Sequence, residues 1–84
     1  MNQSFITFRS VTFAQRAEAV LRQKNMEAAI QRTPRWMEEQ GCGYCLKLWT
    51  QDIYRSVELL RNSRIPMRKV YVHSDDGQLE EVAV

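Results

Sequence analysis

Residues 33–49 read TPRWMEEQGCGYCLKLW, and this stretch carries both cysteines of the chain. Its last six residues, Tyr44 to Trp49, alternate with period two, which predicts a β-strand. The residues before it are polar and contain glycine and proline, which is typical of a loop between two strands. The alternation assigns Tyr44, Leu46 and Leu48 to one side of the strand and Cys45, Lys47 and Trp49 to the other.

Apolar runs on both sides of this stretch predict three more strands. They are expected at residues 5–8, at residues 26–30, where Pro34 closes the segment, and at residues 67–73. The tail begins with an Asp-Gly turn signal at residues 76–77. Residues 79–84 are then expected either to return as a fifth, edge strand or to form a loose terminus.

Two amphipathic helices are predicted between the strands. Either Ser10 or Thr12 can cap the first, and Thr12 with Gln15 forms a capping-box pattern. Its end is expected near Asn25, because Asn tolerates the left-handed conformation. Thr50 is the predicted cap of the second helix. The buried stripes are expected to hold Phe13, Ala17, Val20 and Leu21 in the first helix, and Ile53, Tyr54, Val57 and Leu60 in the second.

The element order is therefore β-α-β-β-α-β, which predicts an α+β, ferredoxin-like split β-α-β sandwich. At 84 residues the chain is one domain, with its core at about residues 4–73 and a tail at 74–84. Both helices are expected to cover one face of the sheet. The face away from the helices, which we call the second face, should then carry Thr7, Cys45, Lys47, Trp49, Lys69, Tyr71 and His73.

Aromatic side chains on the second face suggest a covering partner, since large apolar patches usually mark interfaces. A homodimer or a second protein is expected to contact Trp49, Tyr71 and the edge at residues 79–84. An alternative is that these aromatics and lysines stack single-stranded RNA. The balanced composition, with 12 basic and 10 acidic residues and a net charge of +2, makes nucleic acid an unfavoured partner.

No apolar run approaches the roughly 18 residues of a membrane span, so no membrane partner is expected. The first residues lack a basic and then apolar leader, which predicts a cytoplasmic protein. In such a compartment cysteines more often serve in redox, metal or transfer chemistry than as structural disulfides.

The Thr33-Pro34-Arg35 turn after one strand, and the Cys42-Gly43 pair that opens the next, resemble a family of small selenium/sulfur carrier-like proteins. The resemblance covers roughly residues 4–73. It implies that Cys42 carries sulfur or selenium and that Thr33, Pro34 and Arg35 form the family's turn. Cys45 and the acidic pair Glu38-Glu39 depart from the family pattern.

A transfer thiol must ionise and be reached by its partners. Gly41 and Gly43 would allow close approach to Cys42, and Arg32 and Arg35 would favour its thiolate. The resemblance then implies a persulfide or selenide relay between donor and acceptor proteins, with no cofactor. No acid–base constellation accompanies the thiols, so an accessory carrier is expected rather than an enzyme.

The role of Cys45 is open from the sequence alone. It can act as a resolving cysteine for Cys42, or it can pack as an apolar residue on the second face. A metal site would need more ligands than the two cysteines and His73, so only a dimer could close a four-cysteine zinc site.

Overall fold

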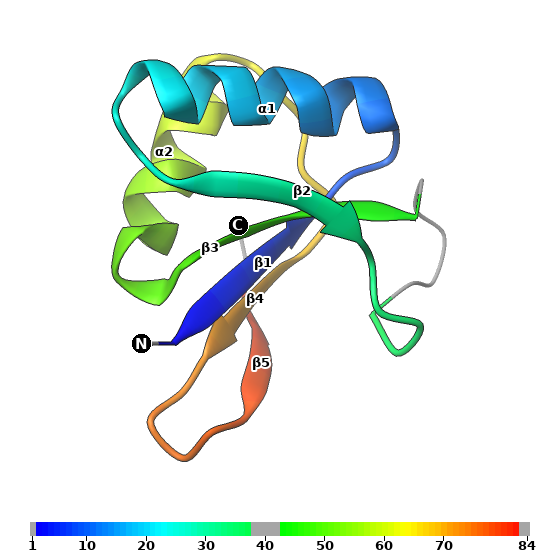
Figure 1. Ribbon diagram of the computed structural model, residues 1–84, viewed down its shortest axis with the longest axis vertical. Helices are drawn as coiled ribbons and strands as arrows, with labels where there is room; N and C mark the ends of the chain where they lie inside the picture. The colour runs from blue at the N-terminus through cyan, green and yellow to red at the C-terminus, as the bar shows by residue number, and fades with distance from the viewer. Residues whose placement is uncertain (1, 38–42, 83–84) are drawn as a thin grey trace.

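The computed structural model describes residues 2–37 and 43–82. Five strands form one antiparallel sheet in the order β2-β3-β1-β4-β5, and two helices accompany it (Figure 1). In chain order the elements are β1 (Gln3–Thr7), α1 (Val11–Gln23), β2 (Ala28–Arg32), β3 (Tyr44–Trp49), a 3-10 turn η1 (Thr50–Asp52), α2 (Ile53–Asn62), β4 (Val70–His73) and β5 (Leu79–Val82).

This architecture confirms the α+β class. The C-terminal segment forms the fifth, edge strand, and residues 83 and 84 of the predicted strand lie outside the described residues. The ferredoxin-like assignment stays a prediction, because the sheet carries this additional strand.

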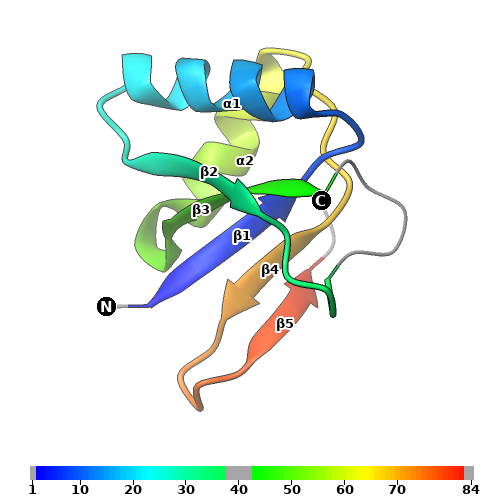
Figure 2. The same ribbon diagram turned by 45° about the vertical axis from the view of Figure 1, so that its right-hand side comes forward.

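Both helices lie on the same face of the sheet, as the strand register and the buried cluster together show. Ile6 lies opposite Leu46 and Val70, and side chains opposite each other across a ladder share a face. All three belong to one buried cluster with residues of both helices, which therefore cover the same face (Figure 2). The helical members of the cluster are Ala14, Ala17 and Leu21 of α1 and Ile53, Val57 and Leu60 of α2.

The structure shows which of the two candidates, Ser10 or Thr12, caps α1. The Ser10 hydroxyl accepts a hydrogen bond from the Phe13 N–H at 3.2 Å, whereas Thr12 lies inside the helix and is exposed. The Thr12–Gln15 capping box is therefore wrong, because the helix begins one residue before Thr12. Asn25 ends this region with φ of 60°, as its left-handed tolerance predicted.

Two expectations for α2 are wrong. Thr50 does not cap the helix, because its hydroxyl pairs with the buried Ser4 hydroxyl at 2.7 Å and η1 intervenes before Ile53. Tyr54 is 65% exposed, because it follows Ile53 by a single residue and points about 100° around the helix from it. The buried face is completed by Ser56 instead.

The bounds of β1, β2 and β4 differ from the predicted ones, and β1 spans Gln3–Thr7 rather than residues 5–8. β2 spans Ala28–Arg32 rather than residues 26–30, because its register with β3 pairs Ala28 with Leu48. Met26 ends the α1 turn, with its N–H bonded to the Leu21 carbonyl at 3.0 Å, and its side chain enters the core. β4 begins at Val70 rather than at residue 67.

The helix cap gives a first test. Replacing Ser10 with Ala leaves the N–H of Phe13 without its acceptor and should lower the free energy of unfolding by about 1 kcal/mol. In a domain of this size that corresponds to a fall in Tm of about 4–8 °C. The matched control, Thr12→Ala, should change stability by no more than about 0.5 kcal/mol. Equal losses in both variants would contradict the cap assignment.

The turn between β4 and β5 gives a pH test. The Ser74 hydroxyl donates to the Asp76 carboxylate, and the Gln78 N–H donates to it at 3.1 Å. These bonds, the Ser74 bond above all, hold the pKa of Asp76 below its ordinary value. Because the folded pKa is lowered, this contribution to stability is present above the unfolded pKa and is lost as pH falls through the folded pKa.

NMR titration of the carboxyl carbons should show the Asp76 midpoint rising when Ser74 is replaced by Ala. A midpoint that stays unchanged in Ser74→Ala would show that the hydroxyl does not hold this carboxylate.

Candidate functional site

A hydrogen-bonded pair, Thr33 and Gly43, closes the loop that joins β2 to β3, and we call this pair the base of the loop. The Thr33 N–H donates to the Gly43 carbonyl at 2.9 Å, which extends the ladder one step beyond the Arg32–Tyr44 pair. Gly43 has φ of 84°, a left-handed conformation that glycine adopts at no steric cost. Two predicted site residues, Gly41 and Cys42, lie outside the described residues. The described base therefore fixes the residue that directly follows Cys42.

The predicted Thr-Pro-Arg turn lies over the second face. The Pro34 carbonyl accepts a hydrogen bond from the Met37 N–H at 3.0 Å, which closes the turn. Trp36 then meets Tyr71 of β4 edge to face, with ring centroids 5.6 Å apart. The chain leaves β2 and turns down toward β4 and β5, as Figure 2 shows. Arg35 is exposed at this turn.

Cys45 is fully buried on the second face of β3. It lies between Gln31 and Thr7 on the neighbouring strands and is 0% exposed. Met37 and Tyr71 are also buried, and none of these three side chains belongs to the cluster beneath the helices. The chain's own turn therefore contributes to covering Tyr71. The expected partner over Trp49, Tyr71 and residues 79–84 stays a prediction. The burial of Cys45 agrees with the packed role among the two that the sequence left open.

Sequence reasoning missed the role of Trp36 and Met37, which it treated as part of a polar loop. The signal was present, since two large apolar residues stand together in an otherwise polar segment. Trp36 remains 60% exposed although its edge contacts Tyr71, so it also forms part of the outer surface of the turn.

The two arginines proposed near Cys42 have different surroundings. The Arg32 guanidinium lies 5.4 Å from the centre of the Tyr44 ring, and its Nη1 donates to the tyrosine hydroxyl at 3.5 Å. This cation–π contact holds the Arg32 guanidinium against Tyr44, beside the base of the loop. Arg35 is the exposed cation of the turn, and its relation to Cys42 lies outside the described residues.

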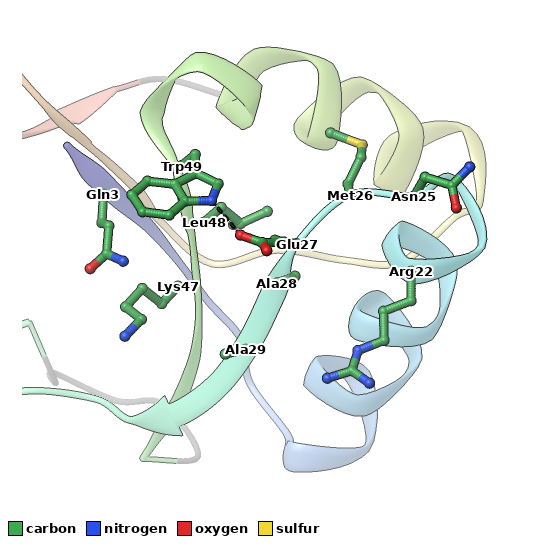
Figure 3. Close-up of a pocket in the computed structure, with 10 residues that line it drawn as sticks. All are labelled: Gln3, Arg22, Asn25, Met26, Glu27, Ala28, Ala29, Lys47, Leu48 and Trp49. Carbon is green, nitrogen blue, oxygen red and sulfur yellow. Dashed lines mark hydrogen bonds between the residues drawn. The ribbon is translucent and has the colours of Figure 1, made fainter. Parts of the chain in front are cut away.

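The opposite end of the second face is hollow. A cavity of about 440 Å³ lies beside β2, where Trp49 and Lys47 line it from β3 (Figure 3). The Trp49 indole Nε1–H donates to Glu27 Oε2 at 2.6 Å, which fixes the ring at the cavity wall. Sequence reasoning did not single out Glu27, because the contact joins residues 22 positions apart, Glu27 just before β2 and Trp49 at the end of β3.

The described part of the chain can be checked for the features of two function classes, metal binding and membrane spanning. Within residues 2–37 and 43–82, no group of three or more His, Cys, Asp or Glu side chains is arranged to hold a metal ion. Over the same residues, neither helix has the length and apolar content needed to cross a membrane.

The burial of Cys45 gives a labelling test. If the turn covers Cys45, Trp36→Ala should loosen the turn and speed iodoacetamide labelling of Cys45. An aromatic pair is worth about 0.5–1.5 kcal/mol, so labelling should be about two- to tenfold faster. Tyr54→Ala removes a comparably exposed aromatic from α2 and serves as the control. Peptide mapping separates the two cysteines. Cys45 labelling that is already rapid in the unaltered protein would contradict the covering role.

Comparison with known proteins identifies the family of the chain. No curated protein and no solved structure matches the chain. A family model described as "Putative Se/S carrier protein-like" matches residues 3–72, a span that runs from β1 through most of β4 and contains both cysteines and the turn between them. The chain therefore belongs to this selenium/sulfur carrier-like family.

Proposed function

We propose that this protein carries sulfur or selenium on the Cys42 thiol and passes it between protein partners. Membership of the carrier-like family supports the class of function. The observation that carries the residue assignment is the complete burial of Cys45 on the second face. A transfer thiol has to meet the cysteine of another protein, which a side chain with 0% exposure does not do without rearrangement. Cys42 is the other cysteine of the chain and takes the role.

The transfer is a thiol exchange that needs no cofactor. The Cys42 thiolate attacks the outer sulfur of a cysteine persulfide on the donor protein. A new S–S bond forms at Cys42, the donor's S–S bond breaks, and its electron pair leaves with the donor sulfur as a thiolate. The acceptor thiolate then attacks the outer sulfur on Cys42 in the same way and releases the Cys42 thiolate. Neither step changes the total oxidation state.

The sequence neighbours of Cys42 support this exchange. Cys42 directly precedes Gly43, whose carbonyl is held by Thr33 at the base of the loop. The exposed Arg35 belongs to the same loop and supplies a positive charge that favours a thiolate in its neighbourhood. The protein then acts as an accessory carrier in a reducing compartment such as the cytoplasm, and a donor and an acceptor protein are its partners.

Loading tests the proposal. Protein incubated with a cysteine desulfurase and cysteine should gain the mass of sulfur, and dithiothreitol should remove it. Cys42→Ser should abolish this gain, because a serine hydroxyl does not displace a thiolate from a persulfide. Cys45→Ala removes a buried side chain and should keep the gain. Loading that survives Cys42→Ser, or that is lost only in Cys45→Ala, would rule out Cys42 as the carrier.

A further inference from the structure

β2 forms one edge of the sheet, and alternate residues along it point their backbone groups outward. The Thr33 N–H points toward β3, because it donates to the Gly43 carbonyl. In an antiparallel ladder the N–H and C=O of one residue point to one side, and those of the next residue point to the other. Ala28, Ile30 and Arg32 therefore direct their N–H and C=O away from β3. Within the described chain, no strand lies on that side of β2.

Over its first four residues, this edge lacks the features that usually prevent another strand from pairing with it. Natural edge strands are protected by charged side chains, prolines or bulges. The first four residues of β2 are Ala28, Ala29, Ile30 and Gln31, which are uncharged, and the charged Arg32 stands only at the end of the strand. The other edge of the sheet, β5, carries Glu80 and Glu81. The contrast marks β2 as the receptive edge.

The cavity of about 440 Å³ adjoins this edge. Figure 3 shows Trp49, Lys47 and Gln3 on one side of β2 and Arg22 of α1 on the other. Ala29 lies opposite Lys47 on the second face, and its small side chain leaves room above it, whereas Ala28 belongs to the core cluster. A strand laid along β2 would project alternate side chains into this space, against the indole of Trp49.

The charges around the cavity favour an acidic occupant. Its lining includes two cations, Arg22 and Lys47, and one carboxylate, Glu27, which is bonded to the Trp49 indole. Arg22 makes an exposed contact with Glu18 at 3.5 Å. In the described part of the chain, Lys47 makes no ion pair. A carboxylate on an incoming strand would therefore find complementary charge beside the edge.

We propose that an extended acidic segment of a partner protein adds to β2 as a further strand. Its backbone pairs with the outward groups of Ala28 and Ile30, an apolar side chain lies on Ala29 against Trp49, and a carboxylate meets Lys47. A second copy of the chain fits less well. Pairing β2 with itself through the outward groups sets Arg32 of one copy opposite Ala28 of the other, beside the like charge of Arg22. The inference does not depend on the chemistry of Cys42.

A designed peptide tests this surface. The probe is an acetylated and amidated hexapeptide, Val-Thr-Glu-Thr-Val-Thr, in which valine and glutamate share one face of the strand, and the control peptide has lysine in place of glutamate. A Trp36→Phe variant leaves Trp49 as the sole tryptophan, so its emission reports binding. The glutamate peptide should shift the emission in a saturable way, and the lysine peptide should bind at least about tenfold more weakly. Lys47→Glu should weaken the glutamate peptide by about the same factor.

A backbone variant separates strand pairing from charge attraction. Ile30→Pro removes an outward N–H without removing a ladder bond to β3, a position where edge strands accept proline. Ile30→Val keeps the N–H and is the matched control. With folding of both verified by thermal unfolding, the proline variant should lose peptide binding and the valine variant should keep it.

Equal binding by the two Ile30 variants, equal binding of the two peptides, or absence of binding by the glutamate peptide at millimolar concentration would each overturn the proposal. Sedimentation that shows a homodimer abolished by Ile30→Pro would assign the edge to a second copy and would overturn it as well.

Discussion

The register of β3 between β1 and β2 is the constraint on which the rest of the molecule depends. Leu46 lies opposite Ile6 on one side and Ile30 on the other, so it enters the core beneath the helices. Because successive side chains of a strand point to opposite faces, this one pairing sends Cys45 and Lys47 to the second face. A slip by one residue would bury Lys47 under the helices and expose Leu46. The apolar core beneath the helices excludes this arrangement.

The second face is then divided along its length. At one end the turn after β2 sets Trp36 on Tyr71, and Cys45 is buried on the same side of the sheet. At the other end Trp49 is held by Glu27 at the wall of a cavity, beside an unpaired strand edge. The chain thus covers Cys45 itself and keeps an accessible surface at the far end of the same strands. This division is consistent with the two proposals, sulfur exchange on Cys42 and docking of a partner strand at β2.

Local patterns in the sequence were sufficient for much of this arrangement. The period-two alternation predicted the bounds of β3, and the chemistry of Asn25 predicted the end of α1. Contacts between distant segments were not predictable in this way. Thr50 has the composition of a helix cap, yet its hydroxyl pairs with Ser4, 46 positions away. The packing of Trp36 on Tyr71 likewise depends on where the loop returns, which no local propensity determines.

We expect Cys42 to exchange sulfur while Cys45 stays packed. NMR of protein labelled with ¹³C at the cysteine Cβ positions, before and after exposure to a persulfide-charged donor, separates the two thiols. The Cβ resonance of Cys42 should move on loading and return after reduction, while that of Cys45 stays in place. Movement of the Cys45 resonance alone, or of neither resonance, would show that Cys42 is not the carrier.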